Sequence, residues 1–300
     1  MDTLDIFQGL QFNEAITKKQ LHTYYPRVSN FKTSDEIRIS IQHQDVYTLP
    51  SESFIYIEGK FKHDAAGTGT CELTNNAYAF LFDQIRYEIN GVEVDRCTKP
   101  GITSSIKGYI SYGDNETKFL EMSGWCPNSK TQPTISLNNK FNAYIPLKFF
   151  LGFAEDYKKI IINASQELIL LRSGNDLNCY HNTTTGGTKV ASFDIDKIEW
   201  HVPHINVNDE IRLKLLKTLK SSYYNRNNQP LLSYEKFKEC ALYVIDCANQ
   251  KEAVKSSIVD VKLELESLSG FTEDTTAYCL IIHDNIVEYT PLSGTVKKII

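Results

Sequence analysis

The sequence has no apolar run long enough to cross a bilayer as a helix, which takes about 20 residues. Its first residues, MDTLDIFQGLQFNEAITKK, lack the basic stretch followed by an apolar stretch that marks a secretory signal. The seven cysteines form no CxxC pair and are odd in number, which favours reduced thiols over a disulfide framework. These absences predict an intracellular protein that is not secreted and has no membrane partner.

Sequence motifs for catalysis and cofactor binding are also missing. The patterns GxxxxGK[ST], GxGxxG and HExxH do not occur, and Gly186 and Gly187 are a glycine pair in a polar loop rather than a phosphate cradle. Acidic residues (37) outnumber basic ones (32), which gives a net charge of -5. Because nucleic-acid-binding domains are usually basic, the charge predicts no sequence-specific nucleic-acid partner.

The strongest local signal is the segment IRYEINGVEVDR, residues 85–96, in which Asn90 and Gly91 separate two alternating runs. Asn-Gly favours a two-residue turn in which both positions have positive φ, so the segment predicts a β-hairpin. A lone hairpin is marginal in water, so its apolar face predicts a larger sheet with a second layer. We expect four cross-strand pairs, two apolar and two charged: Ile89 with Val92, Tyr87 with Val94, Glu88 with Glu93, and Arg86 with Asp95.

Short alternating or apolar runs recur along the first two thirds of the chain. Gly59 is a bulge candidate, and the last of these runs has a register break near Asp196. With the hairpin they make about eight strands without a repeated βαβ order, which predicts an all-β sandwich or jelly roll. The runs predict strands over residues 36–42, 54–61, 71–75, 141–146, 159–162, 167–171 and 190–202.

The connecting segments carry weaker signals. Pro100 and Gly101 predict a turn, and the residues after them, 102–112, fit either a short helix or a strand. Residues 1–30 lack periodicity and predict a terminal arm with a short extended segment. Three further segments are predicted from composition: a long loop over 114–139 anchored by Trp125, a helical turn with an aromatic face over 147–157, and a surface loop over 173–188.

Residues 209–219, DEIRLKLLKTL, form the clearest helix, with a cap at Asn208 or Asp209 and one apolar face. Its basic face is either solvated or an anionic contact: Arg212, Lys214, Lys217 and Lys220. Four strands are predicted after it, half of what a jelly roll needs: 242–246, 256–265, 277–283 and 287–289. The chain is therefore expected to have three parts: an arm over 1–30, a first jelly roll over 31–205, and a linking helix with an incomplete second jelly roll over 206–300.

Three pairs of reactive side chains fit ordinary structural roles better than chemistry: His201 with His204, Cys279 with His283, and Glu155 with Asp156. The two histidines are three residues apart on a predicted strand and point to opposite faces, so they do not share a metal. The cysteine and its histidine are too far apart along a strand for a nucleophile pair. The adjacent carboxylates diverge. We predict no catalytic, cofactor-binding or metal-binding residue and no enzyme activity.

Five stretches resemble the double jelly roll-like proteins found in many copies in insect and other arthropod genomes. They are NNAYAFLFDQIRYEINGVEVDR (75–96), PGITSSIKGY (100–109), IPLKFFLGFAEDYKKIIINASQELILLRS (145–173), IEWHVPHI (198–205) and YCLIIHDNIVEYTPLSG (278–294). Those proteins are similar to the major capsid proteins of Polinton- or adintovirus-like DNA viruses. The resemblance covers nearly the whole chain, and its motifs are structural rather than chemical.

The resemblance implies two jelly rolls in tandem, with three copies forming a pseudo-hexagonal capsomer, and it implies neither catalytic residues nor a cofactor. The sequence departs from the family where Lys220, Ser221 and Ser222 join the helix over 209–219 directly to a tyrosine-rich turn. The first half of the second jelly roll is missing there, in agreement with the four strands counted after the helix. A deletion, a splice variant and a gene-model error would each produce this junction.

We therefore predict a structural, capsid-like protein, either viral or an endogenous viral element, that acts by self-assembly inside a cell or in a virion. The alternative is a jelly-roll module that binds a carbohydrate or another ligand through Trp125, Tyr180 and polar loop residues. An enzyme on this scaffold is a third reading, which no constellation of residues supports.

Overall fold

The computed structural model describes residues 16–42, 47–64, 67–127, 139–162, 164–182, 187–207, 276–281, 287–290 and 294–298. The chain divides into two compact units, the first comprising Met1–Leu231 with Asn285–Ile300 and the second Leu232–Asp284. Of the second unit, only residues 276–281 are described. The helix predicted over 209–219 and the strands predicted over 242–246 and 256–265 lie outside the described residues.

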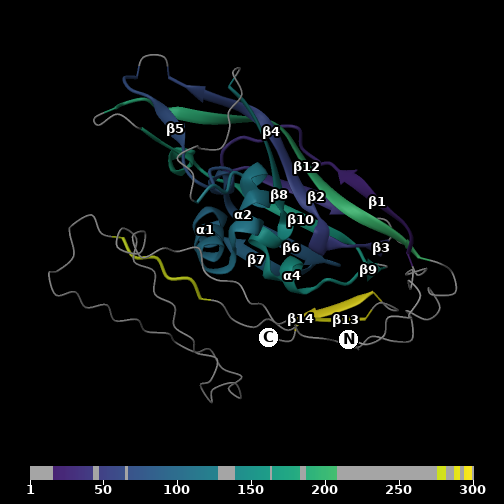
Figure 1. The fold of residues 1–300 in the computed structure, drawn as a ribbon. Coiled ribbons are helices and arrows are strands. Elements are labelled where there is room, and N and C mark those ends of the chain that lie inside the picture. Colours follow the sequence, from purple (N-terminus) through teal and green to yellow (C-terminus); the bar gives the residue numbers. More distant parts are fainter. Residues whose placement is uncertain are drawn as a thin grey trace. The chain divides into compact units, whose positions relative to one another are not determined.

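Two large antiparallel sheets form the body of the first unit (Figure 1). The first sheet contains, in spatial order, β1 (Ile16–Tyr24), β12 (Ala191–Val207), β4 (Phe54–His63) and β8 (Lys140–Pro146), with the short β3 (Tyr47–Thr48) and β9 (Ile161–Ile162) at one end. The second sheet contains β2 (Glu36–Ile41), β10 (Gln166–Arg172), β6 (Phe82–Ile89) and β7 (Val92–Thr98). The chain passes back and forth between the two sheets, which is the connectivity of a jelly roll, so the predicted fold class is confirmed.

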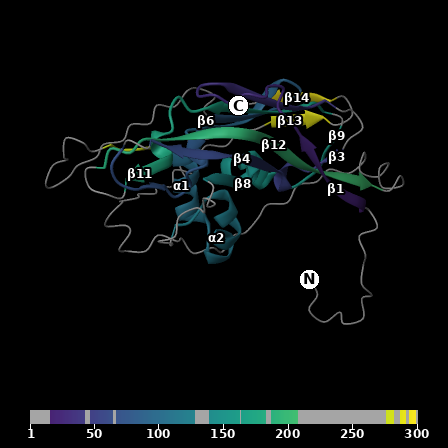
Figure 2. The same cartoon turned by 90° about the horizontal axis from the view of Figure 1, so that it is seen from above.

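The inner faces of the two sheets form one apolar core. Figure 2 shows the two layers, with β6 of the second sheet on one side and β4 and β8 of the first sheet on the other. Strict alternation along β2 and β4 buries Ile37, Ile39, Ile55 and Ile57, while the residues between them face outward. Burial of each such side chain contributes about 1.5–3 kcal/mol. Closure of one sheet on the other is therefore the main source of stability.

The hairpin between β6 and β7 has the predicted turn. Asn90 and Gly91 have φ angles of 51° and 76°, the left-handed values that this turn requires. The Asn90 side chain adds a contact, because its Oδ1 accepts a hydrogen bond from Ser165 N at 2.7 Å. The two pairs next to the turn form as predicted: Ile89 with Val92, and Glu88 with Glu93.

A bulge at Val94 changes the register of the rest of the hairpin. Two predicted pairs are therefore wrong, because the structure pairs Tyr87 with Asp95 and Arg86 with Arg96, instead of Tyr87 with Val94 and Arg86 with Asp95. One contact that holds the bulge comes from outside the hairpin: Asp95 Oδ2 accepts a hydrogen bond from Phe153 N at 2.8 Å. The bulge leaves both Val94 and Cys97 buried, a spacing that a regular strand does not allow.

A second bulge confirms the register break predicted near Asp196, where β12 carries one residue more than its partner β4. Gly59 lies opposite Ile195 at this point. A Cβ atom at Gly59 would lie 2.3 Å from Asp194 O and 2.9 Å from the Phe141 ring. The bulge is therefore on the strand opposite Gly59, and the close approach of that strand requires glycine.

Helices follow two of the strands: α1 (Pro100–Ser111) and α2 (Asp114–Leu120) after β7, and α3 (Leu147–Phe150) and α4 (Gly152–Asp156) after β8. Residues 102–112 are thus mostly helical, and α1 begins where a turn was predicted. The prediction of an unbroken loop over 114–139 is wrong, because α2 occupies its start; Trp125 anchors this stretch as expected and is fully buried. The helical turn predicted over 147–157 is confirmed as α3 and α4.

Three other predictions need correction. Residues 16–24 are not a loose arm, because β1 pairs with β12 along its whole length. Residues 173–182 are not a plain loop: they contain the 3₁₀ turn η4 (Leu177–Cys179) and β11 (Tyr180–Asn182), which pairs with β5 (Cys71–Leu73). Residues 277–281 are not a strand. The remaining elements are η1 (Pro50–Glu52), η2 (Ala79–Leu81), η3 (Glu121–Ser123), β13 (Val287–Thr290) and β14 (Thr295–Lys298).

Replacing Gly59 with Ala is expected to destabilise the protein by about 1–3 kcal/mol, because the added methyl group overlaps backbone of the neighbouring strand. Urea unfolding followed by tryptophan fluorescence measures the change. Gly152→Ala is the matched control: its Cβ would approach only Asp95 Oδ2, at 3.9 Å, and alanine favours a helix. Equal stability of Gly59→Ala and the wild type would contradict the close approach of β4 and β12.

Candidate functional site

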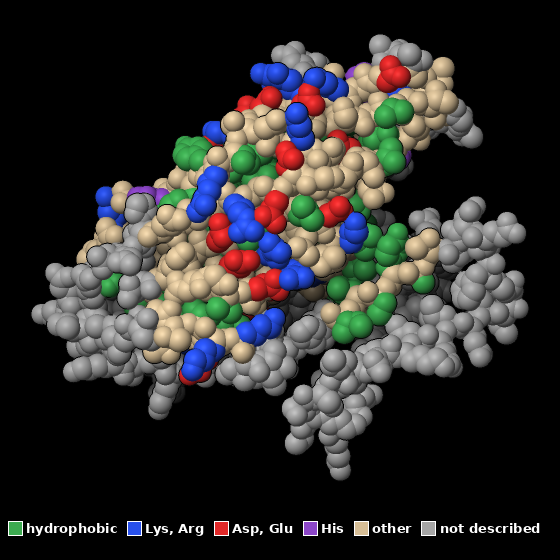
Figure 3. Space-filling view, turned by 180° about the vertical axis from the view of Figure 1, so that it is seen from behind, with side chains coloured by type: hydrophobic (Ala, Val, Ile, Leu, Met, Phe, Trp, Pro, Cys, Tyr) green, Lys and Arg blue, Asp and Glu red, His purple; other side chains and the backbone are tan. Residues whose placement is uncertain are grey.

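The two outer faces of the sandwich differ in chemistry. The outer face of the second sheet carries ion pairs within and between strands, and we call it the ion-paired face: Arg38 with Glu36 at 2.6 Å and with Glu167 at 3.2 Å, Arg86 with Glu36 at 3.3 Å, and Arg96 with Glu93. Figure 3 shows basic and acidic side chains interspersed over the middle of the face seen from behind. Exposed pairs of this kind contribute at most about 1 kcal/mol each, so their charges mainly keep this face hydrated.

The outer face of the first sheet also carries ion pairs, Lys60 with Asp196 at 3.8 Å and Lys62 with Asp194, and in addition it carries a cluster of rings from three strands. We call it the aromatic face: Phe54 and Tyr56 on β4, Tyr144 on β8 and His201 on β12. Ring centroids lie 4.8 Å apart for Phe54 and His201, which stack, 4.8 Å for Tyr56 and Tyr144, and 5.6 Å for Phe54 and Tyr144. Side chains two residues apart on a strand share a face, and cross-strand register brings the others beside them.

One carboxylate is enclosed within the aromatic face. The Glu199 side chain is only 5% exposed, and it lies 2.7 Å from Lys197 Nζ and 2.9 Å from His201 Nε2. The other ring nitrogen of His201 lies 3.2 Å from Thr23 Oγ1 on β1. Burial alone would raise the pKa of the Glu199 carboxyl, but the hydrogen bonds from Lys197 and His201 outweigh it and hold the pKa below its usual value.

The aromatic face has the composition of a protein interface. Rings gathered around a charge that is already paired resemble the core of an association surface, where aromatic residues are enriched and unpaired charges are rare. Tyr144, on the edge strand β8, is 37% exposed, so one ring of the cluster still meets solvent. The face was not predictable from any one stretch of sequence, because its members are far apart in the chain. The available signal was that Phe54 and Tyr56 occupy outward positions of a strand, which are usually polar.

The two histidines singled out from the sequence make separate polar contacts. His201 belongs to the aromatic face, whereas His204 stacks on His22 with ring centroids 3.8 Å apart and its Nε2 lies 2.7 Å from Tyr24 Oη. Among the residues that the structure describes, no group of three His, Cys, Asp or Glu side chains is placed to hold a metal ion.

The other candidates also have structural surroundings. Glu155 Oε2 lies 2.6 Å from Lys107 Nζ, which ties α4 to α1. Cys279 is an exposed thiol, while His283 and Gly186 lie outside the described residues, as does the basic helix face over 209–219. Within the described part of the chain, no helix is long and apolar enough to span a bilayer.

The two aromatic side chains predicted for the alternative ligand site, Trp125 and Tyr180, are buried. Trp125 is 0% exposed and Tyr180 is 8% exposed, so neither can offer a face to a sugar. Trp125 instead packs edge-to-face on Tyr109 with ring centroids 5.0 Å apart. The five described cysteines are free thiols, and burial raises the pKa of Cys97 to about 12, so it stays protonated and unreactive.

Comparison with known proteins assigns this fold to a family. The family model described as the double jelly roll-like domain matches residues 71–224 and 219–287. The chain belongs to the double jelly roll-like domain family. The two matched stretches meet around residues 219–224, which contain the Lys220–Ser222 junction at which the sequence departs from the resemblance. No functionally curated protein matches the sequence.

Several solved structures are similar to this chain at low sequence identity. The match to the Sputnik virophage structure covers 69% of this chain and 51% of the virophage chain, with 11% identity and a TM-score of 0.48. The match to the Faustovirus major capsid protein covers 71% of this chain and 58% of that protein, with 12% identity and a TM-score of 0.47. The match to the PBCV-1 virus capsid covers 69% of this chain and 46% of the capsid chain, with 10% identity and a TM-score of 0.43. The chain thus spans about half the length of the proteins it matches.

Replacing Glu199 with Gln is expected to lower stability at neutral pH and to reduce its loss in acid. Because the folded-state pKa lies below the usual 4.5, ionised Glu199 stabilises the fold above that pH, and this stability is lost as pH falls through the folded pKa. Urea midpoints at pH 7 and at about pH 4 measure the change. Asp194→Asn on the same strand, whose side chain is 49% exposed, is the control. An identical pH dependence in Glu199→Gln and the wild type would contradict this assignment.

Proposed function

We propose that this protein is a structural, capsid-like protein that works by associating with copies of itself. Its membership of the double jelly roll-like domain family supports the proposal, as does the sandwich of two antiparallel sheets to which β1 adds a strand. The observation that carries it is the aromatic face of the first sheet, where rings from three strands lie around a carboxylate that Lys197 and His201 neutralise.

The proposed partner is a second and a third copy of the chain, as in a trimeric capsomer. The arrangement rests on a first jelly roll over 31–205, extended by β1, and a shortened second jelly roll over 206–300. Its proposed location is a virion or the interior of a cell. A packaging ATPase, DNA polymerase or protease gene beside its gene would mark an intact viral element of the Polinton or adintovirus type. An isolated gene in an arthropod genome would mark an endogenous one.

Size-exclusion chromatography with light scattering tests the proposal on the full chain. The expected result is an assembly larger than a monomer at micromolar concentration, with rings or sheets of uniform spacing in negative-stain electron micrographs. A well-behaved monomer at high concentration would contradict self-assembly. No enzymatic activity is proposed; among the described residues, no group of three His, Cys, Asp or Glu side chains is placed to hold a metal ion.

Tyr144→Glu is expected to weaken self-association by about tenfold or more, because it places a charge at the most exposed ring of the aromatic face. Analytical ultracentrifugation over a concentration series measures the dissociation constant. Ser40→Glu on the ion-paired face is the matched control, since it adds the same charge beside Arg27 on β2's outward side. An equal effect of both variants, or none with Tyr144→Glu, would remove the aromatic face from the interface.

A further inference from the structure

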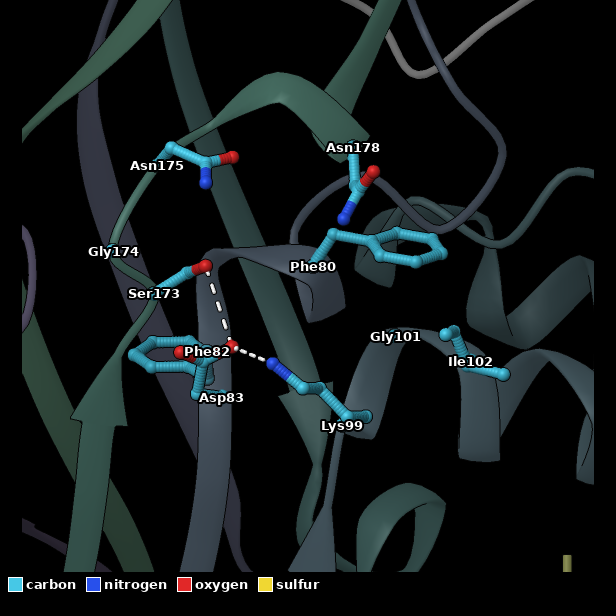
Figure 4. Close-up of a pocket in the computed structure, with 10 residues that line it drawn as sticks. All are labelled: Phe80, Phe82, Asp83, Lys99, Gly101, Ile102, Ser173, Gly174, Asn175 and Asn178. Atoms are coloured by element: carbon cyan, nitrogen blue, oxygen red, sulfur yellow. Dashed lines mark hydrogen bonds and ion pairs between the residues drawn. The ribbon is translucent and has the colours of Figure 1, made fainter. Parts of the chain in front are cut away.

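A separate pocket of about 170 Å³ lies where three distant segments converge: residues 80–83 at the start of β6, residues 99–102 at the start of α1, and residues 173–178 after β10 (Figure 4). It contains none of the residues of the aromatic face. Its volume is below that of pockets for drug-sized ligands, so an occupant would be about the size of one small ring.

The backbone around the pocket is held in an unusual conformation. Lys99 has a φ of 50°, a left-handed value that a non-glycine residue adopts at a cost of about 1 kcal/mol or more, and its N–H donates to Asp83 O at 2.8 Å. Gly101 follows at the first turn of α1, where a Cβ atom would lie 2.3 Å from the Phe80 ring. The absence of a side chain at Gly101 therefore lets the Phe80 ring lie against the helix as one wall of the pocket.

The charges in the pocket are already paired with one another. Asp83 Oδ1 lies 2.7 Å from Lys99 Nζ and 3.4 Å from Ser173 Oγ, and Figure 4 shows both side chains reaching toward it. A free anion would be repelled by Asp83, and a free cation would be repelled by Lys99. The pocket is therefore suited to a neutral ligand that offers hydroxyl groups to a fixed carboxylate and a fixed ammonium group.

Two carboxamides add both donors and acceptors. Asn175 Oδ1 accepts a hydrogen bond from Leu177 N at 3.1 Å, which orients its amide nitrogen. Asn178 is fixed through its backbone, whose carbonyl accepts from Thr74 Oγ1 at 2.9 Å, while its side chain makes no hydrogen bond with the described residues. Figure 4 shows the two amides on the opposite side of the pocket from Lys99. The amide nitrogen of Asn175 and the side-chain amide of Asn178 can thus form hydrogen bonds with a ligand.

We propose that this pocket binds a neutral, polyhydroxylated ring, a single pyranose sugar at the end of a glycan. The hydroxyl groups would meet Asn175, Asn178 and the Asp83–Lys99 pair, and the C–H face of the ring would lie against Phe80. The site is distinct from Trp125 and Tyr180, which are buried, and it does not depend on self-assembly. With this site, a structural protein would also bind a carbohydrate.

The test uses the full-length protein and a panel of methyl pyranosides of glucose, galactose and mannose together with N-acetylglucosamine. Saturation-transfer NMR and titration calorimetry are expected to give millimolar binding of at least one sugar, weakened about tenfold or more in Asn178→Ala. Asn142→Ala, an exposed amide on β8, is expected to bind as the wild type does. Gly101→Ala is a second variant that is expected to weaken sugar binding, because the added methyl group displaces the Phe80 ring. Circular dichroism verifies that each variant is folded.

Three results would overturn the proposal. The first is the absence of saturable binding by any sugar of the panel at concentrations well above the millimolar range. The second is sugar binding that Asn178→Ala leaves unchanged. The third is saturable binding of inorganic sulfate that Lys99→Ala abolishes, because it would make the pocket an anion site.

Discussion

The closing of two antiparallel sheets over one apolar core is the constraint from which the other features of this molecule follow. β12 is the member that makes closure possible, since it pairs with β4 over its first half and with β1 over its second. Its bulge beside Gly59 lies within the half that pairs with β4, where it bends the strand. Trp200 on this strand reaches across the core to Tyr87, with ring centroids 6.1 Å apart. A sandwich closed in this way leaves two outer faces for function.

The strands that alternate most regularly were the ones predictable from the sequence. In β2 and β4 every second residue is apolar and buried, so the period of two in the sequence is the period of the fold. The turn at Asn90 and Gly91 and the break near Asp196 were predictable for the same reason, because local chemistry decides both. The jelly-roll class followed from the number and spacing of such segments.

The features that were missed depend on contacts between distant residues. β1 has almost no buried position, and what defines it is the backbone of β12 rather than a pattern of its own. The register of β7 depends on the hydrogen bond that Phe153 N donates to Asp95, 58 positions away in the chain. A contact between residues so far apart in sequence cannot be predicted from a local pattern. The loop after β10 is ordered by the buried pair of Arg172 and Asp176, 2.5 Å apart. The aromatic face and the sugar pocket likewise assemble from separate segments.

The central claim is that β1 belongs to the sandwich as the strand beside β12. Hydrogen–deuterium exchange measured by mass spectrometry on the full chain tests it most directly. The account predicts slow exchange in peptides covering β12 and β10, and clear protection of residues 18–24, whose backbone pairs with β12. Exchange of residues 18–24 at the rate of an unstructured peptide, while β12 stays protected, would contradict it.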